Sequence, residues 1–215
     1  MPLIRHKRVV PAGELGIWKV EEPIAFYDEN LELFEEEKIE VAALSPRKKL
    51  EWMATRYLLH YMTGQKVRTP CLKDKFGKPH LKNSNYKISI SHSGDLVAVI
   101  ASPFHVGVDV QYLVPKITRI ANRFCTDEEY AFALKGSFIE NLHIIWGAKE
   151  CLYKAYGRRQ LDFKNQLKVN PFSISMGDQV ATTATLIANH HRRHFNIFST
   201  LYENYILVYA IENQL

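Results

Sequence analysis

The chain has 215 residues, of which 47% are hydrophobic and 24% charged, a balance typical of a globular protein with one sizeable core or two small ones. Its longest uninterrupted apolar run, residues 96–101, is far shorter than the ~20 residues that cross a bilayer, and no apolar signal core follows the basic N-terminus. Three cysteines at irregular spacing form neither a disulfide framework nor a zinc motif, so we expect a cytoplasmic protein and exclude a membrane protein, a secreted scaffold and a disordered tail.

Charge is distributed unevenly along the chain. Of the 28 basic and 23 acidic residues, one base and nine acids lie within residues 21–40, so the rest of the chain carries a net charge of +13. Such a basic body attracts polyanions, which include nucleic acids, phosphorylated cofactors and acidic proteins. Composition alone does not choose among these three classes.

In the first half, alternation at residues 15–20 predicts a first strand, and the acidic segment 28–43 is expected to form one helix. Ser45 and Pro46 are a helix-start signal in which the serine hydroxyl caps the helix. Apolar residues then recur at steps of three and four until Gly64, which predicts a helix that ends there. Residues 65–85 are rich in turn signals, and strands are expected at 86–91, 95–101 and 105–112.

The second half shows helical character at 116–123, after residue 126 and over 138–156, and strand character at 172–176, 180–187, 194–199 and 204–212. The element order suggests two comparable halves that meet near residue 105, with boundaries at 1–105 and 106–215. This order predicts an α+β fold with mostly antiparallel sheets.

The segment VGVDVQ at residues 106–111 carries a candidate metal site. On a strand its three valines share one face, while Asp109 and Gln111 project together from the other face beside Gly107. Oxygen ligands of this kind suit Mg²⁺. A half-exposed edge strand explains the pattern equally.

The segment WGAKECLYK at residues 146–154 places Trp146, Glu150 and Lys154 four residues apart on one helix face. One interpretation is an ordinary ion pair with a tryptophan anchor. In the other, Glu150 is a metal ligand or base and Lys154 contacts a phosphate.

Two further motifs allow both a binding and a structural interpretation. A turn with Ser91 and His92 could form a phosphate pocket or a solvated loop, and a Ser/His hydrolase is not expected because no orienting acid is evident. Thr126 and Glu129 have the spacing of a capping box. Basic residues lie near a helix start and a glycine turn, among them Arg47, Arg56 and Lys78. They could bind phosphate, or they could form a solvated basic face.

Taken together, GKP at 77–79, ISISHS at 88–93, VGVDVQ, FCTDEE at 124–129 and WGAKECLYK resemble the signatures of the 4′-phosphopantetheinyl transferase superfamily. The SHS turn and the chain length are similar to the longer type, which activates surfactin synthetase and related enzymes. The resemblance covers residues 45–160.

This resemblance implies that the protein transfers 4′-phosphopantetheine from coenzyme A to a serine of an apo acyl or peptidyl carrier protein. The reaction depends on Mg²⁺ and releases 3′,5′-ADP. It also implies a monomer with two similar α+β halves, related by a pseudo-twofold axis, with the active site between them. The expected partner is an acidic carrier protein. Binding to nucleic acid or to a membrane is not expected.

The resemblance also assigns roles to single residues. Metal ligands are expected at Asp109, Gln111 and Glu150, and catalytic roles at Glu150, Lys154 and Glu129. Contacts to the adenylate end of coenzyme A are expected from Arg47, Arg56, Lys78, Pro79, Ser91 and His92, and contacts to its phosphates from Lys154. Gln111 departs from the family, which often has an acid at this position, so its amide oxygen would ligate without charge.

Two non-catalytic alternatives stay open. The chain could be a coenzyme A binder that has lost transfer, or a nucleic-acid binding module that uses the basic surface. The second lacks aromatic residues interleaved with its basic stretches, and its acidic segment would repel phosphate.

Overall fold

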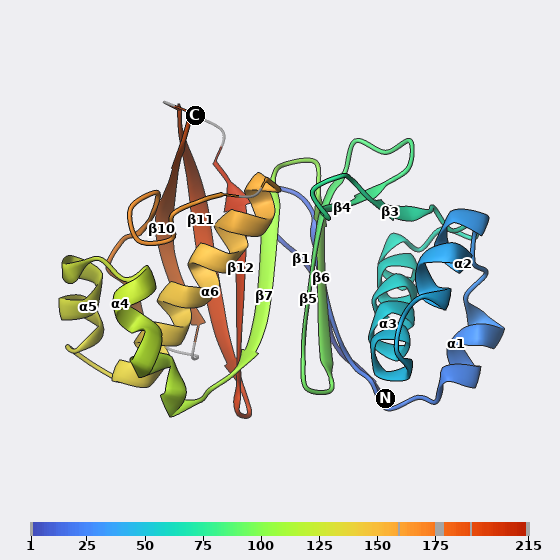
Figure 1. Ribbon diagram of the computed structural model, residues 1–215, viewed down its shortest axis with the longest axis horizontal. Coiled ribbons are helices and arrows are strands. Elements are labelled where there is room, and N and C mark those ends of the chain that lie inside the picture. The colour runs from blue at the N-terminus through green and yellow to red at the C-terminus, as the bar shows by residue number, and fades with distance from the viewer. Residues whose placement is uncertain (1, 159, 175–178, 190, 214–215) are drawn as a thin grey trace. The chain divides into compact units, whose positions relative to one another are not determined.

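The computed structural model describes residues 2–158, 160–174, 179–189 and 191–213 and divides the chain into two compact units, Met1–Phe104 and His105–Leu215. Each unit consists of an antiparallel sheet with one long helix packed on it (Figure 1). The α+β class and the two similar halves are therefore confirmed. In the described part of the chain, no helix is both long and apolar enough to cross a membrane.

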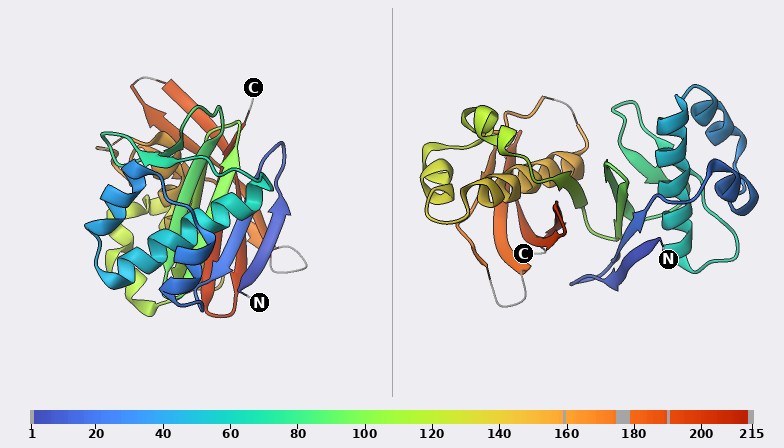
Figure 2. Two further views of the ribbon diagram at one scale, coloured as in Figure 1. Left: turned by 90° about the vertical axis from the view of Figure 1, so that its right-hand side faces the viewer. Right: turned by 90° about the horizontal axis from the view of Figure 1, so that it is seen from below.

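The sheet of the first unit has the strand order β1-β2-β6-β5-β4-β3. Its strands are β1 (Leu3–Arg8), β2 (Glu14–Lys19), β3 (Cys71–Lys73), β4 (Pro79–Leu81), β5 (Lys87–Ser93) and β6 (Leu96–Ser102). The helices are α1 (Ile24–Asn30), α2 (Glu35–Ala42) and α3 (Pro46–Thr63). Helix α3 packs on β2 and β6, and Figure 2 shows α1 and α2 on the side of α3 that faces away from the sheet.

Helix α3 begins and ends where the sequence predicts. Pro46 occupies the first helical position, and Gly64 ends the helix with a left-handed φ of 60°. The predicted serine cap is wrong, because the side chain of Ser45 makes no capping hydrogen bond. Proline presets the helical φ and has no N–H to satisfy, so the helix start does not depend on the hydroxyl.

The acidic segment forms two helices, which corrects the expectation of one continuous helix. Leu31 has extended backbone at the end of α1 and a buried side chain. The next residue, Glu32, accepts a hydrogen bond from Arg68 Nε at its carbonyl oxygen (2.8 Å). Arg68 also pairs with the buried carboxylate of Glu37 in α2. Tertiary contacts from a distant residue thus interrupt the helix that local composition favours.

Three short or exposed strands were not predicted. β1 precedes the strand expected to be first, and it contains no buried residue and shows little alternation of burial. β3 and β4 lie in the turn-rich segment, and each has only three residues. A strand of this length is too short to produce a readable period of two.

The sheet of the second unit has the order β7-β12-β11-β10-β8, with β9 paired to β10. Its strands are β7 (Val106–Tyr112), β8 (Leu167–Val169), β9 (Ser173–Ile174), β10 (Gln179–Ala188), β11 (His191–Tyr202) and β12 (Tyr205–Glu212). The helical elements are η1 (Pro115–Ile120), α4 (Ala121–Phe124), α5 (Asp127–Ala133) and α6 (Phe138–Tyr156). The predicted helix over 138–156 is confirmed. Of the strand predicted at 172–176, residues 175 and 176 lie outside the described residues, and β8 was missed.

Two glycines allow α6 to approach the sheet closely. A Cβ atom on Gly107 of β7 would lie 1.9 Å from the carbonyl oxygen of Cys151 in α6. A Cβ atom on Gly147 of α6 would lie 2.6 Å from a methyl group of Val208 in β12 and 2.9 Å from Nε2 of Gln111. Since real Cβ atoms do not make contacts this short, the spacing between helix and strand requires glycine at both positions.

We expect Gly107→Ala to lower the free energy of unfolding by about 3 kcal/mol or more, because the added methyl group meets backbone that cannot rotate away. Urea unfolding measures this loss. Gly136→Ala is the matched control, since its Cβ meets no backbone and lies 3.2 Å from Nδ2 of the Asn141 side chain. It should change stability by less than about 1 kcal/mol, and equal losses in the two variants would contradict the packing argument.

Candidate active site

Asp109 of β7 and Lys154 of α6 form the centre of a polar group in the second unit. Lys154 Nζ lies 2.9 Å from Asp109 Oδ1 and donates a hydrogen bond to the carbonyl oxygen of Val108 (2.8 Å). The side chain of Asp109 is only 10% exposed. Gln111 Nε2 donates to Asp109 Oδ2 (3.1 Å), which confirms that these two residues share one face of the strand.

Glu150 adds a second carboxylate one turn before Lys154 on α6. The pKa of Glu150 is raised to about 6, chiefly by burial and also by the nearby charge of Asp109, while Lys154 acts in the opposite direction. When both carboxylates are ionised, the single ammonium group of Lys154 does not balance their charge. The group is therefore suited to attract a cation.

The donor atoms fit Mg²⁺ in particular. Asp109 and Glu150 offer only oxygen atoms, and Mg²⁺ is commonly held by one or two carboxylates together with waters and substrate phosphates. Among the residues that the structure describes, no group of three or more His, Cys, Asp or Glu side chains could hold a metal. A site here would therefore rely on two protein carboxylates.

His143 belongs to the same group, although it was not among the residues predicted from the sequence. His143 is buried on α6, and its Nδ1 lies 2.7 Å from Oε1 of Gln111. Gln111 Nε2 donates to the carbonyl oxygen of His143 (3.1 Å). A signal was available, because His143 lies seven residues before Glu150, which is two turns along the same helix face.

Glu129 lies in a separate buried network. Its Oε1 accepts the N–H of Val169 (2.9 Å), and its Oε2 accepts the N–H of Thr126 (2.8 Å) and a bond from Lys149 Nζ (2.7 Å). The Thr126 hydroxyl accepts the N–H of Glu129 in return, so the predicted capping box is confirmed. Glu129 thus links α5, α6 and β8, and Lys149 is a partner that the sequence analysis did not single out.

Trp146 is the aromatic anchor of α6. Its ring packs against those of Phe124, with centroids 5.1 Å apart, and Phe163, at 5.5 Å. Phe124 and Phe163 also contact Lys149, whose Nζ donates to their carbonyl oxygens. The tryptophan therefore stabilises the helix position beside this buried network.

In the first unit, Arg47 and His92 share one acidic partner. Arg47 Nε donates to Glu51 Oε1 (3.2 Å), and His92 Nδ1 lies 3.4 Å from Glu51 Oε2. Both basic side chains are more than half exposed, whereas that of Glu51 is 15% exposed. Glu51, which sequence reasoning missed, holds the start of α3 near the end of β5.

Three other predicted residues of the first unit lie on β5 and at the start of β4. Ser91 is buried in β5. Lys78 and Pro79 follow a tight turn at Gly77, whose φ is 89°, and Asp74 Oδ1 accepts the N–H of Lys78 (3.0 Å).

Arg56 lies in the core of the first unit and not on its basic surface. It is 3% exposed, its guanidinium lies 4.0 Å above the ring of Trp52, and it pairs with Glu40 at 3.6 Å. Arg47 and Arg56 are nine residues apart, which places them on opposite faces of a helix with 3.6 residues per turn. The two arginines therefore cannot form one basic face, which corrects that expectation.

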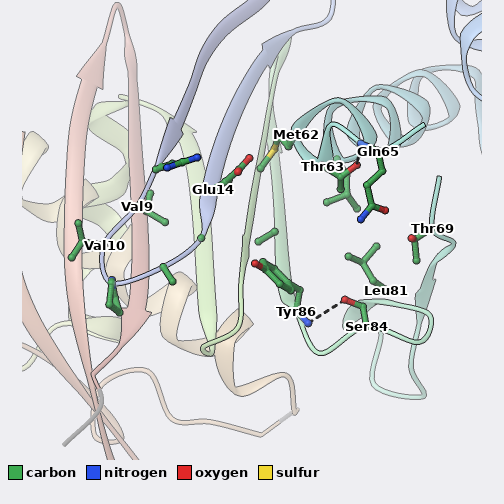
Figure 3. A pocket seen from close by; sticks show the side chains of 16 residues that line it. Val9, Val10, Glu14, Met62, Thr63, Gln65, Thr69, Leu81, Ser84 and Tyr86 are labelled. Atoms are coloured by element: carbon green, nitrogen blue, oxygen red, sulfur yellow. Dashed lines mark hydrogen bonds between the residues drawn. The ribbon is translucent and has the colours of Figure 1, made fainter. Parts of the chain in front are cut away.

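A cavity of about 630 Å³ also lies in the first unit (Figure 3). Its walls come from the β1–β2 loop, the last turns of α3 and the segment around β4, and they include Val9, Met62, Gln65 and Tyr86. None of the site residues predicted from the sequence lines it. The cavity is therefore separate from the groups described above.

Comparisons with known proteins agree with the motifs. Residues 105–210 match the family model of the 4′-phosphopantetheinyl transferase superfamily. The chain is also 25% identical over 111 residues to the 4′-phosphopantetheinyl transferase gsp of Aneurinibacillus migulanus. That alignment covers 50% of this chain and 46% of the relative, so the chain matches about half of the relative's length.

The raised pKa of Glu150 makes a prediction about stability. The pKa is about 6 in the folded protein and ordinarily 4.5, so ionisation of Glu150 destabilises the fold. This cost is absent below about pH 4.5 and complete above pH 6. Glu150→Gln, which stays neutral, should raise the Tm of the metal-free protein by about 4–8 °C near pH 7.5 and change it little at about pH 4.5.

Thermal unfolding at both pH values measures this difference, and Glu29→Gln, at an exposed position of α1, is the control that should show no effect. A Tm for Glu150→Gln that does not differ from wild type at the higher pH would contradict the prediction.

The Glu129–Lys149 pair makes a second prediction. Glu129→Gln leaves a buried ammonium group without its charged partner and should lower the free energy of unfolding by about 3–5 kcal/mol. The double variant Glu129→Gln with Lys149→Met removes both charges and should lose less than the single variant. Urea unfolding compares them, and an additive loss would show that the pair is not coupled. Glu35→Gln, in the exposed pair with Lys38, should cost under about 1 kcal/mol.

Proposed function

We propose that the chain, whose residues 105–210 match the 4′-phosphopantetheinyl transferase superfamily, transfers 4′-phosphopantetheine from coenzyme A to a serine of an apo carrier protein. The observation that supports this best is the group formed by Asp109, Glu150 and Lys154. All three lie within the residues that match the family, on one strand and the helix packed against it.

In this reaction the serine oxygen attacks the phosphorus atom that carries pantetheine. The bond between that phosphorus and the bridging oxygen breaks, and 3′,5′-ADP leaves. Glu150 takes the proton of the serine hydroxyl, directly or through a water. A carboxylate whose pKa is raised to about 6 by burial is a better base than an exposed glutamate and is still ionised at neutral pH.

Lys154 provides the positive charge of the site. It now pairs with Asp109 at 2.9 Å, and a phosphate oxygen of the donor can accept a hydrogen bond from the same ammonium group. Asp109 and Glu150 would hold Mg²⁺, which when bound neutralises charge on the pyrophosphate. Fixed charges that are in place before the reaction lower the barrier without reorganisation.

The remaining roles rest on the family resemblance. Arg47 and His92, which share Glu51, are assigned to the adenylate end of coenzyme A together with Lys78, Pro79 and Ser91. Arg56 is not part of this contact, because its guanidinium is buried and paired with Glu40. Glu129 acts through Lys149 by holding α6 in place, since three donors already occupy its oxygens.

The acceptor is proposed to be an acidic carrier protein, because the chain outside residues 21–40 carries a net charge of +13. A monomer in the cytoplasm is part of the same proposal. Its three cysteines are buried and unpaired, as expected in a reducing compartment. The non-catalytic alternatives gain no support, since a passive binder has no need of a buried, unbalanced pair of carboxylates.

The test is incubation of the protein with coenzyme A, Mg²⁺ and an apo carrier protein, with mass spectrometry of the carrier. Wild type should add one phosphopantetheine group. Asp109→Asn and Glu150→Gln should lower the rate about 100-fold or more, the scale of a lost electrostatic contact.

The matched control is Asp127→Asn, at an exposed carboxylate of α5, which should transfer at the wild-type rate. Wild-type turnover in Asp109→Asn would refute the assigned role. Coenzyme A binding without transfer to fatty-acid, polyketide or peptide carrier proteins would leave only the non-catalytic binder.

A further inference from the structure

A chain of hydrogen bonds runs from the backbone of Val114 through two side chains to the candidate metal ligand Asp109. The N–H of Val114 donates to Nε2 of His143 (3.0 Å), and Nδ1 of His143 lies 2.7 Å from Oε1 of Gln111. Nε2 of Gln111 then donates to Oδ2 of Asp109 (3.1 Å). Each link determines which atom the next one presents.

The first link determines the tautomer of His143. A backbone N–H can only donate, so Nε2 must carry a lone pair, and the single proton of the neutral ring is on Nδ1. The carbonyl oxygen of Val114 is slightly farther from Nε2, at 3.2 Å. The opposite tautomer would place two N–H groups, those of Nε2 and Val114, against each other. Burial of His143 also lowers its pKa, which favours the neutral ring.

The tautomer in turn determines the orientation of the Gln111 amide. A protonated Nδ1 needs an acceptor, so Oε1 of Gln111 faces His143 and Nε2 faces Asp109. The two hydrogens of Nε2 are both used, one by Asp109 and one by the carbonyl oxygen of His143 (3.1 Å). Gly147 leaves the room for this nitrogen, because a Cβ atom there would lie 2.9 Å from it.

We infer that His143 and Gln111 are positioning residues and that Gln111 is not a metal ligand. His143 holds the amide of Gln111, and the amide nitrogen holds Oδ2 of Asp109, while Lys154 contacts Oδ1. This replaces the sequence-based expectation that Gln111 contributes its oxygen to the ion. The inference rests on the proposed function in one respect, which is that Asp109 is the residue that binds Mg²⁺.

The direct test is the tautomer of His143, measured by long-range ¹H–¹⁵N correlation spectroscopy on the labelled protein without metal, coenzyme A or carrier. The spectrum should show a protonated Nδ1 and an unprotonated Nε2. His143→Phe identifies the signals by their disappearance. A proton on Nε2 would reverse the amide of Gln111 and overturn the inference.

A second measurement is calorimetric titration of Mg²⁺ into the protein with coenzyme A bound. His143→Phe and Gln111→Leu should each weaken Mg²⁺ binding about tenfold, which is typical for a group that orients a ligating carboxylate. The double variant should be no weaker than either single variant, because both remove the same chain of bonds. His143→Asn, whose amide nitrogen can donate in place of Nδ1, should recover part of the loss.

Two results would overturn the inference in this titration. Gln111→Leu could abolish Mg²⁺ binding while His143→Phe leaves it unchanged, which would make Gln111 a direct ligand. The two effects could also add fully in the double variant. Ile197→Val, in the core of the same unit, controls for a loss of stability alone and should not change Mg²⁺ affinity.

Failure of the inference and failure of the proposed function give different results. If wild type transfers phosphopantetheine but His143 carries its proton on Nε2, the function stands and the inference falls. If the tautomer is as expected but wild type modifies no carrier protein, the bond chain stands and the transferase proposal falls.

Discussion

The close contact between α6 and β7 is the constraint on which the second unit depends. The backbone of α6 reaches the strand at Gly107, where the carbonyl oxygen of Cys151 occupies the space of a side chain. At this spacing Lys154, one turn later on the helix, reaches both the carbonyl oxygen of Val108 and the carboxylate of Asp109. If a methyl group at residue 107 pushed α6 away from β7, Lys154 would no longer lie within hydrogen-bond distance of both Val108 and Asp109.

The second unit contains two buried charge networks with different balances. In one, Glu129 and Lys149 have opposite charges, and every oxygen of the carboxylate has a donor. In the other, Asp109 and Glu150 share the single charge of Lys154, and the pKa of Glu150 is raised first by burial and then by the charge of Asp109. A balanced pair supports the fold, whereas an unbalanced one is stabilised by a further positive charge. This difference in charge balance separates the structural residues from the candidate functional residues.

Local patterns were sufficient to predict the elements that carry the site. The period of α6, its end at Gly157 and the alternation of β7 placed Asp109, Glu150 and Lys154 on the elements where the structure has them. The partners His143, Lys149 and Glu51 were missed because their roles depend on contacts from other elements. The break between α1 and α2 was missed for the same reason, since Arg68, far along the chain, binds the carbonyl oxygen of Glu32. Periodicity reports which residues share a face but not what a distant segment places against that face.

Gly107 and Gly147, the two glycines at this contact, differ in whether substitutions elsewhere could allow evolution to replace them. At Gly147 the obstacles are the side chains of Val208 and Gln111, so smaller residues at both positions could make room for alanine in α6. At Gly107 the obstacle is the main chain of Cys151, which no substitution at position 151 removes. Gly147 could therefore be replaced together with compensatory substitutions at neighbouring side chains. Gly107 can be replaced only if the helix itself moves.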